Sequence, residues 1–322
     1  MSERLAAGID LGGTKIHSLV ATAKGDVLGE DRCATHAAEG GPDAVVARID
    51  ASVRRALEQA GLTTNDIVGA GISSPGPCEP ASGIVTDAPN LPGFHNVPLA
   101  RLVSEALGVA TVLENDANAA AYGEFRLGAG QGVRHLIYVT LGTGIGGGII
   151  IDGKVYWGAS GAAGEVGHLV VDEDGPVCNC GGRGCVEALA SGRAIAREAR
   201  AVVKAGRSPL LAELAGEGPI TAEIVHEAAL RGDSAAREVI ERAGRYLGLG
   251  LVGLLNCFNP EALILGGGLT NLGSFYLEPA IRTAREGAFD QVVSDVTISL
   301  AKLGERAGAL GAAAIMLDVE PR

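Results

Sequence analysis

The sequence has no hydrophobic run long enough to span a bilayer. The uncharged run from Leu136 to Ile151 is shorter than the about 20 apolar residues of a transmembrane helix, and five glycines interrupt it. The segment that follows Met1 has neither the apolar core nor the cleavage site of a signal peptide. We therefore expect a cytoplasmic protein with reduced thiols and no membrane partner.

Positive charge is also scarce and scattered. Lys and Arg number 26 against 38 Asp and Glu, so the net charge is −12, and no basic block stands out. Phosphate backbones are bound by clustered Lys and Arg, so we expect no nucleic-acid partner. A hydrophobic content of 47% with 20% charged residues indicates a globular protein. The length of 322 residues suits two domains or one large one.

Glycine is abundant, with 49 residues and no collagen-like period. Many glycines fall in turns, where bare backbone can approach a ligand closely. A strand, a glycine-rich turn and a second strand occupy 6–29, and a similar unit returns at 136–158. This internal repeat predicts two related α/β domains that face each other. Because no low-complexity linker separates them, we expect the domain boundary to be a hinge between elements.

Helical signals fill the intervals between the strands. Apolar residues recur at helical spacing over 42–60, with Pro near the start and Gly61 past the end. A second helix is expected over 99–107. Asp233 can cap a long helix that becomes wholly apolar and ends before Pro260. We also expect a buried strand that starts near Glu261 and a small-residue helix over 306–317.

Two glycine turns predict a nucleotide site. "DLGGTK", 10–15, follows a strand, so its N–H groups, Thr14 and Lys15 can meet a phosphate, and Asp10 can hold Mg²⁺ through water. The spacing is not that of a Walker loop, and alone it is compatible with an ordinary hairpin turn. "LGTGIGGG", 141–148, supplies a second turn of this kind, which favours a nucleotide between two domains. "GGG", 266–268, is expected to form a third wall beside the adenosine.

The segment "VLENDANAAAYGE", 112–124, places Asp116 between a strand that ends near Leu113 and a helix that begins near Asn118. Asp116 is then either the helix N-cap or a carboxylate that the helix N-terminus keeps ionised and ready to accept a proton. Two Pro/Gly turns, 73–80 and 88–94, are typical of plain loops. Asn90 between its prolines can alternatively offer an amide to a substrate hydroxyl group.

The segment "GHLVVDEDGPVCNCGGRGCVE", 167–187, predicts a metal site. His168, Cys178, Cys180 and Cys185 form a complete tetrahedral zinc set, which leaves no open position and indicates structural zinc. The alternative is a buried or disulfide-bonded cluster. The remaining cysteines, Cys33, Cys78 and Cys257, are expected to be small core residues. Glu165 and Glu187 flank the site and are either surface charges or acceptors for sugar hydroxyl groups.

Together these motifs resemble the ROK family of sugar kinases and repressors over nearly the whole chain, from about Ile9 to Gly311. Segment 167–187 matches the family's zinc signature, GHxxxxxxGxxCxCGxxGCxE, at every fixed position. The resemblance implies an α/β, two-domain, actin-like (ribonuclease H-like) sugar kinase fold with a cleft between the domains. It implies a small domain of residues 1–117 plus 305–322, and a large domain, 118–304, that carries the zinc knot.

The resemblance also implies roles for individual residues. Asp116 would be the catalytic base, and His168 would use one ring nitrogen for zinc and the other for a sugar hydroxyl group. The positions implied for the sugar are Gly76, Asn90, Asn115, Asp116, Glu165, His168 and Glu187. Those implied for ATP and Mg²⁺ are Asp10, Gly12, Gly13, Thr14, Lys15, Thr143, Gly144, Gly267 and Gly268.

The implied activity is that of an ATP-dependent hexose kinase of the glucokinase branch, which phosphorylates the 6-hydroxyl group of glucose. The alternative within the family is an N-acetylmannosamine or N-acetylglucosamine kinase. A repressor is disfavoured because the first strand starts by about Leu5, which leaves no room for a DNA-binding domain, and because the chain is acidic. An actin- or chaperone-like ATPase is disfavoured by Asp116 and the carboxylates beside the zinc. The preferred sugar, ATP or polyphosphate as donor, and a homodimer or a homotetramer are left open.

Overall fold

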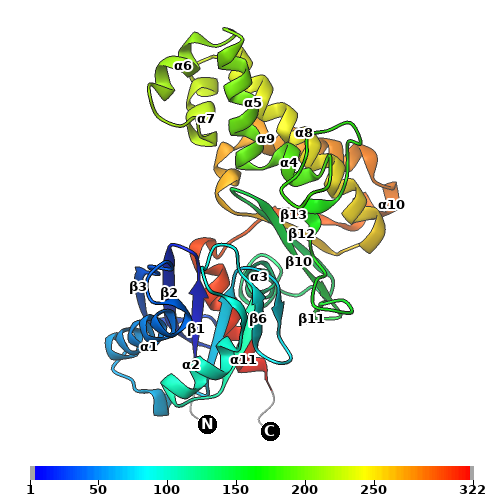
Figure 1. Cartoon of the computed structure of the whole chain (residues 1–322). Helices are drawn as coiled ribbons and strands as arrows, with labels where there is room; N and C mark the ends of the chain where they lie inside the picture. Colours follow the sequence, from blue (N-terminus) through cyan, green and yellow to red (C-terminus); the bar gives the residue numbers. More distant parts are fainter. Residues whose placement is uncertain (1–3, 320–322) are drawn as a thin grey trace. The chain divides into compact units, whose positions relative to one another are not determined.

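The computed structural model describes residues 4–319, which form two compact units (Figure 1). Unit 1 consists of the chain up to Leu136, of Gly148–Gly164, and of the chain from Lys302 onward. Unit 2 consists of Ile137–Gly147 and Glu165–Ala301. The domain boundaries implied by the resemblance, 1–117 with 305–322 against 118–304, remain a prediction.

Unit 1 is built on a five-stranded sheet in the order β3-β2-β1-β4-β8. Strands β1, β2 and β3 are antiparallel neighbours, whereas β4 and β8 continue the sheet parallel to β1. The bounds of these strands are β1 Leu5–Leu11, β2 Lys15–Thr22, β3 Val27–Ala34, β4 Ala70–Ser74 and β8 Thr111–Asn115. The carboxyl ends of β1, β4 and β8 therefore lie at one edge of the sheet, which places Asp10, Ser73 and Asn115 at that edge.

Helices cover both faces of this sheet. Helix α1 (Gly41–Gln59) and helix α2 (Leu99–Leu107) share a buried core with Ile9, whereas α11 (Ala307–Asp318) packs against Ala6 on the opposite side of β1. This alternation follows the two-residue period of a strand. Helix α3 (Asp116–Leu127) packs beside α11. Unit 1 also contains a small sheet of β5 (Cys78–Glu79), β6 (Ile84–Asp87) and β7 (His95–Val97), and a 3₁₀ turn, η1, at Thr64–Asp66.

Helix α11 approaches the sheet so closely that only glycine fits beneath it. A Cβ atom on Gly8 would lie 1.9 Å from the carbonyl oxygen of Ala309, and one on Gly71 would lie 1.9 Å from that of Ala312. The small-residue helix predicted over 306–317 is thus confirmed as a closely packed element. The predicted helices 42–60 and 99–107 are likewise confirmed within one or two residues.

The second sheet has the order β11-β10-β9-β12-β13. Its strands are β9 Leu136–Leu141, β10 Ile145–Ile151, β11 Lys154–Val155, β12 Ala262–Gly266 and β13 Thr297–Leu300, and the unit boundary falls within β10. The helices of unit 2 are α4 Val186–Ala190, α5 Gly192–Lys204, α6 Pro209–Ala215, α7 Ala222–Leu230, α8 Ser234–Phe258, α9 Ser274–Gly287 and α10 Asp290–Asp295. Short 3₁₀ turns lie at η2 Val166–His168, η3 Gly268–Leu272 and η4 Gly304–Arg306, the last of which belongs to unit 1.

Helix α8 is the central helix of unit 2 and confirms the long helix predicted after Asp233. The Asp233 side chain caps it by accepting a hydrogen bond from Ala236 N–H at 2.8 Å. Leu247 and Leu251 are buried in the main core of this unit. Helix α8 packs against α9 along its length, and also contacts α4, α5 and α7. Among residues 4–319, no helix combines the length and apolar character needed to cross a membrane.

The isolated cysteines do not all behave as expected. Cys78 is buried, and burial raises the pKa of its thiol to about 12. Cys33 is half-buried, whereas Cys257 is exposed near the end of α8. The prediction of a core position is therefore wrong for Cys257, because an otherwise apolar helix still turns one side to solvent at this point.

Candidate functional site

The first glycine turn, Gly12–Thr14, lies beside the predicted sugar loop. Gly12 N–H donates to the Lys15 carbonyl at 2.9 Å, which closes a tight hairpin between β1 and β2. A Cβ atom on Gly13 would lie 2.8 Å from the carbonyl oxygen of Asn90. Glycine therefore allows these two segments of unit 1 to touch. The structure brings a predicted phosphate turn next to a predicted sugar-binding residue.

Asp10 stands at the end of β1, in the sheet of unit 1. The Ser73 hydroxyl donates to Asp10 Oδ1 at 2.9 Å. Burial raises the pKa of the Asp10 carboxyl, and the Ser73 hydrogen bond partly offsets that rise. A Cβ atom on Gly308 would lie 2.8 Å from the same Oδ1 atom, so α11 leaves no further room on this side. A buried carboxylate of this kind is suited to a cation.

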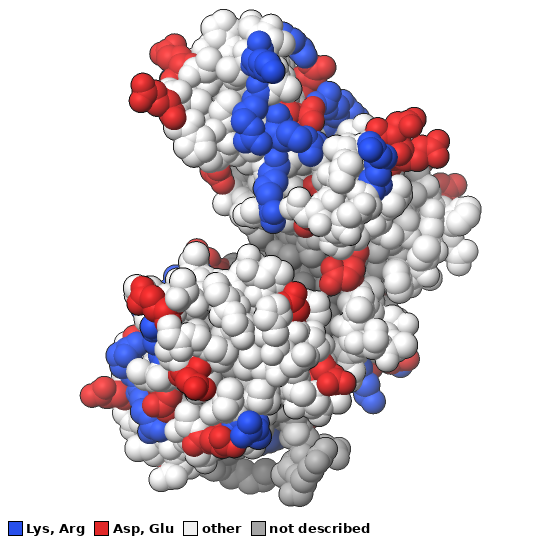
Figure 2. All heavy atoms as spheres, viewed as in Figure 1, with Lys and Arg blue, Asp and Glu red and all other residues white. Residues whose placement is uncertain are grey.

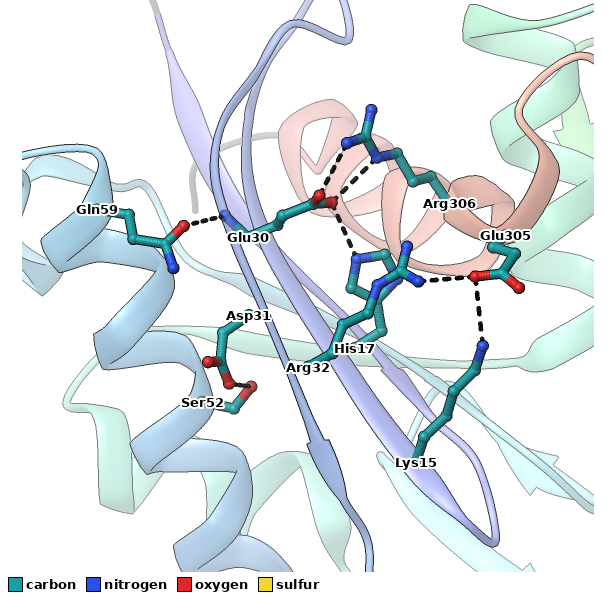
Figure 3. Close-up of polar contacts among 9 residues, drawn as sticks. All are labelled: Lys15, His17, Glu30, Asp31, Arg32, Ser52, Gln59, Glu305 and Arg306. Carbon is teal, nitrogen blue, oxygen red and sulfur yellow. Dashed lines mark hydrogen bonds and ion pairs between the residues drawn. The ribbon is translucent and has the colours of Figure 1, made fainter.

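Lys15 takes part in an ion-pair network rather than pointing into open space (Figure 3). Its Nζ atom lies 3.6 Å from Glu305 Oε2, which also accepts a 2.7 Å hydrogen bond from Arg32. The positive charge of Lys15 is the largest cause that lowers the pKa of Glu305. The network ties β2 and β3 to the turn before α11. Lys15 would have to leave Glu305, at least in part, to meet a phosphate.

Asn115 and Asp116 lie at the junction of β8 and α3. Asn115 Oδ1 accepts hydrogen bonds from Ala117 N–H at 3.0 Å and Asn118 N–H at 3.2 Å. The cap residue is thus Asn115, and the interpretation of Asp116 as the N-cap is wrong. The helix also begins two residues before the predicted Asn118. Asp116 is the exposed first residue of α3, and its Oδ1 accepts from Ala117 N–H at 2.8 Å.

The same capping residue reaches Gly76. Asn115 Nδ2 donates to the Gly76 carbonyl at 3.2 Å. Gly76 has a φ of +86°, and a Cβ atom there would lie 2.1 Å from the Asp87 carbonyl oxygen, so no other residue fits. The structure therefore brings together Gly76 and Asn115, two of the predicted sugar-binding positions in unit 1.

Glu114 is a buried carboxyl group that the sequence analysis did not single out. It is 2% exposed and directly precedes Asn115. Its Oε1 accepts from Asn115 N–H and from Asn118 Nδ2, both at 3.0 Å, and its Oε2 accepts from Trp157 Nε1 at 2.8 Å. Burial is the main cause that raises the pKa of Glu114. Only its place beside the Asn-Asp pair could have signalled this role.

The four predicted metal ligands meet in unit 2. Their ligand atoms all lie within 4.8 Å of one another. The Cys180 and Cys185 sulfurs are 3.8 Å apart, and Cys178 Sγ lies 3.7 Å from His168 Nδ1. In the turn between them, Gly184 has a φ of +68°, and a Cβ atom there would lie 1.5 Å from the Asp172 carbonyl oxygen. The cluster is therefore a candidate metal site.

Glu165 and Glu187 each lie close to one residue of this cluster. His168 Nε2 lies 3.8 Å from Glu165 Oε2, so the two ring nitrogens of His168 face different partners. Glu187 Oε1 lies 4.0 Å from Cys178 Sγ, while its Oε2 accepts from Ile145 N–H at 3.0 Å. Glu187 thus joins the cluster to the second glycine turn.

The second glycine turn opens onto a cavity in unit 2. Gly142 N–H donates to the Gly144 carbonyl at 3.0 Å, which forms a tight turn between β9 and β10. The cavity has a volume of about 500 Å³, in the range of ligand pockets. Its walls come from the second turn, η3 and the first turns of α5 and α7, and they include Thr143, Arg193, Thr221, Glu223 and Gly268.

Only two of the four nucleotide-binding residues predicted in unit 2 line this cavity. Thr143 and Gly268 line it, whereas Gly144 and Gly267 do not. Gly267 has a φ of +88° and packs on Leu141, where a Cβ atom would lie 2.4 Å from the carbonyl oxygen. Arg193 and Glu223 also line the cavity and were not predicted from the sequence. Their positions after the capping residues Ser191 and Thr221 were the available signals.

Comparisons with known proteins agree on one family. The sequence model of the ROK family matches residues 6–319. A glucokinase of Thermotoga maritima is 38% identical over 97% of this chain and 96% of its own length. The ROK hexokinase structure from Thermus thermophilus is 36% identical with a TM-score of 0.83, covering 96% of this chain and 97% of that chain. A ROK family glucokinase structure from Streptomyces griseus, in complex with glucose and AMPPNP, is 38% identical with a TM-score of 0.79, covering 97% and 98%. These structures confirm the predicted fold class, the two-domain actin-like sugar kinase fold.

Proposed function

Because the chain belongs to the ROK family, we propose that it is a glucokinase that transfers the γ-phosphate of ATP to the 6-hydroxyl group of glucose. The observation that carries this proposal is the Streptomyces griseus glucokinase, whose structure holds glucose and AMPPNP and matches nearly the whole chain at 38% identity. The Thermotoga maritima glucokinase supports it at the same identity.

Asp116 is proposed as the general base. It is exposed at the start of α3, so a sugar hydroxyl group can reach it, and the Asn115 cap fixes the backbone beside it. Asp116 would accept the proton of the 6-hydroxyl group as that oxygen attacks the γ-phosphorus atom of ATP in line. The bond between phosphorus and the bridging oxygen then breaks, and ADP leaves.

Sugar binding is assigned to the polar groups that the family resemblance implies. In unit 1, the Asn90 and Asn115 side chains and the Gly76 backbone would donate to or accept from glucose hydroxyl groups. In unit 2, Glu165, His168 and Glu187 would do the same. The contact between Gly13 and Asn90 supports this assignment, because Gly13 belongs to the turn proposed for phosphate and Asn90 is proposed for the sugar.

The phosphate donor is assigned to the two glycine turns and to the cavity of unit 2. Adenosine would lie in the cavity lined by Thr143 and Gly268, with Gly144 and Gly267 shaping the backbone beside it. Backbone N–H groups of Gly12, Gly13 and Thr14 would face the phosphates, and Lys15 would add its charge. Mg²⁺, when bound, neutralises charge on the transferring phosphoryl group, and Asp10 would hold it through water.

Structural zinc is proposed for the cluster of His168, Cys178, Cys180 and Cys185. In a tetrahedral site with Zn–S of about 2.3 Å and Zn–N of about 2.0 Å, two sulfurs are about 3.8 Å apart and a sulfur and a nitrogen about 3.5 Å apart. The distances of 3.8 Å and 3.7 Å in the cluster fit these values. Four protein ligands leave no position for substrate, so the metal would hold Glu165 and Glu187 in place.

The deciding experiment is the kcat/KM for glucose, mannose, fructose, N-acetylmannosamine and N-acetylglucosamine with ATP and Mg²⁺. We expect a strong preference for glucose and a product phosphorylated at the 6-position. Preference for an N-acetyl sugar would instead support an N-acetylmannosamine or N-acetylglucosamine kinase. ATP hydrolysis without any sugar phosphorylation would overturn the kinase proposal. We further propose a cytoplasmic enzyme, where ATP is available, that forms a homodimer or a homotetramer, and light scattering distinguishes these states.

A further inference from the structure

Arg193 lies at the point where α5 meets the second glycine turn. Its Nε atom donates to the Thr143 carbonyl at 3.3 Å, and Gly192 N–H donates to the Gly142 carbonyl at 2.9 Å. Its Nη2 atom is 3.9 Å from the position that a Cβ atom would take on Gly144. The guanidinium group is therefore held against the turn, and it points along the backbone that the proposed function assigns to the donor.

Arg193 forms no ion pair with a carboxylate of the described residues. Among residues 4–319, the Arg193 side chain donates its hydrogen bond to Thr143 and takes part in no ion pair. Arg197, one turn further along α5, differs because it pairs with Glu198 at 3.0 Å. Glu187 is the carboxylate nearest the turn, and its Oε2 is occupied by Ile145 N–H. A cation that is held in place and forms no ion pair is suited to an anionic ligand.

Arg193 also forms a wall between two cavities. It lines the cavity of about 500 Å³ that contains Thr143 and Gly268. On its other side, a cavity of about 330 Å³ is lined by Cys178, Glu187 and Arg193 itself. Figure 2 shows basic side chains in a column where Figure 1 places α5, in a chain whose net charge is −12. Positive charge is thus concentrated beside the turn against the overall charge of the protein.

From these contacts we propose that Arg193 binds the phosphate chain of the donor nucleotide. The inference rests on the proposed function, since it names a residue of the same nucleotide site. The planar guanidinium group can donate two parallel hydrogen bonds to phosphate oxygens, while Nε keeps its bond to Thr143. The N-terminal end of α5, 13 residues long, adds a favourable dipole to the same place. Arg193 is therefore a substrate-binding residue that the motifs of the family did not indicate.

The test compares Arg193→Gln with Arg193→Lys, and uses Arg200→Gln as the matched control. Arg200 lies on the same side of α5, seven residues further on, and lines the smaller cavity but not the larger one. Calorimetry would measure the Kd for AMPPNP, ADP, adenosine and glucose. We expect Arg193→Gln to raise the Kd for AMPPNP and for ADP at least tenfold. The Kd values for adenosine and glucose should stay within twofold of the wild type. Arg193→Lys should lose less affinity for AMPPNP and ADP, because lysine keeps the positive charge, although it cannot donate two parallel hydrogen bonds. Arg200→Gln should resemble the wild type.

Adenosine is the control ligand, because it lacks the phosphate chain that Arg193 is proposed to bind. If Arg193→Gln weakened the binding of adenosine as much as that of ADP, Arg193 would only shape the pocket, and the inference would be wrong. Unchanged AMPPNP and ADP binding in both variants would also overturn it, and would leave Arg193 a surface charge. Measuring both nucleotide binding and sugar phosphorylation by the wild type distinguishes this inference from the proposed function. Phosphate-dependent nucleotide binding through Arg193 without sugar phosphorylation would retain the inference and reject the glucokinase.

Discussion

The indole Nε1 atom of Trp157 donates a 2.8 Å hydrogen bond to Glu114, the residue directly before Asn115. Trp157 is the only tryptophan of the chain and belongs to the segment that returns to unit 2 at Glu165. The other oxygen of Glu114 holds the backbone and the Asn118 side chain at the start of α3. One buried carboxyl group thus organises the backbone that carries Asp116.

Replacing Trp157 tests this arrangement. In Trp157→Phe, Glu114 Oε2 loses its donor while it remains buried, so we expect the free energy of unfolding to fall by about 1–3 kcal/mol. We also expect a lower kcat, because the start of α3 loses a constraint. Denaturant unfolding and steady-state kinetics measure the two effects. The matched control is Tyr156→Phe at the neighbouring position, where the side chain is also exposed. Equal stability of the two variants would show that the Glu114 bond contributes nothing.

Asp116→Asn tests the general base. The amide keeps the size of the side chain but does not accept a proton, so we expect turnover to fall by about 10²–10⁴-fold. The glucose Kd should change little, because the Asn115 cap remains. Asp43→Asn is a suitable control, since Asp43 is also an exposed carboxylate in the first turn of a helix. Near-normal turnover of Asp116→Asn would remove the proposed role.

Metal content tests the cysteine cluster. We expect one zinc per chain in protein purified without added metal, and loss of that zinc in Cys185→Ser. The thermal midpoint should fall in this variant, because the cluster fixes segment 167–187. Cys257→Ser, at an exposed thiol outside the cluster, should retain both zinc and stability. Mass spectrometry of the metal together with thermal unfolding measures both outcomes, and a metal-free wild type of unchanged stability would contradict the site.

The lowered pKa of Glu30 leads us to expect that the protein loses stability in acid. The hydrogen bond from Arg306 is the largest cause that lowers its pKa from 4.5 to about 2 (Figure 3). A carboxyl group whose pKa is lower in the folded state stabilises that state above pH 4.5, and this stabilisation is lost as the pH falls toward 2. Glu30→Gln should therefore be less stable than the wild type at pH 7, and the difference should vanish near pH 2. Unfolding curves across this range would refute the claim if the difference stayed constant.

Asp10→Asn separates stability from activity. Burial raises the pKa of Asp10, so its ionised form is costly in the folded protein at neutral pH. The amide can still accept the hydrogen bond from Ser73. We expect a higher thermal midpoint and a large loss of Mg²⁺-dependent turnover. A lower midpoint would mean that Asp10 is better stabilised by its surroundings than its burial indicates.

Local sequence patterns predicted much of the fold. The helix after Asp233 was predictable because a capping side chain, a long periodic run and Pro260 all agree on its bounds. The cluster of His168, Cys178, Cys180 and Cys185 was predictable because these residues are close in sequence and their types allow few alternatives. The start of α3 was misplaced because either Asn115 or Asp116 can cap a helix. Only the backbone conformation decides which side chain turns back toward the free N–H groups.

Contacts between distant segments were not predictable in the same way. The ion pair of Lys15 with Glu305 joins residues from the two ends of the chain, and no periodicity records it. The bond between Glu114 and Trp157 depends on how a loop returns to the sheet. Arg193 was not predictable because its proposed importance depends on the cavity that it lines and on the absence of an ion pair, which only the three-dimensional structure shows. A sequence lists charges but does not show which of them are neutralised.

The glycine-mediated fit of α11 on the sheet of unit 1 has a consequence for biosynthesis. A ribosome releases α11 only after β1 and the whole of unit 2, because unit 2 is encoded between them. Until α11 emerges, the sheet face that carries Ala6 and Leu19 lacks the α11 side chains that pack on it. The nascent unit 1 must therefore wait, with this apolar face accessible to chaperones, while unit 2 is free to fold. A chain that stalls before Ala307 would contain every proposed catalytic residue and still lack a completed unit 1.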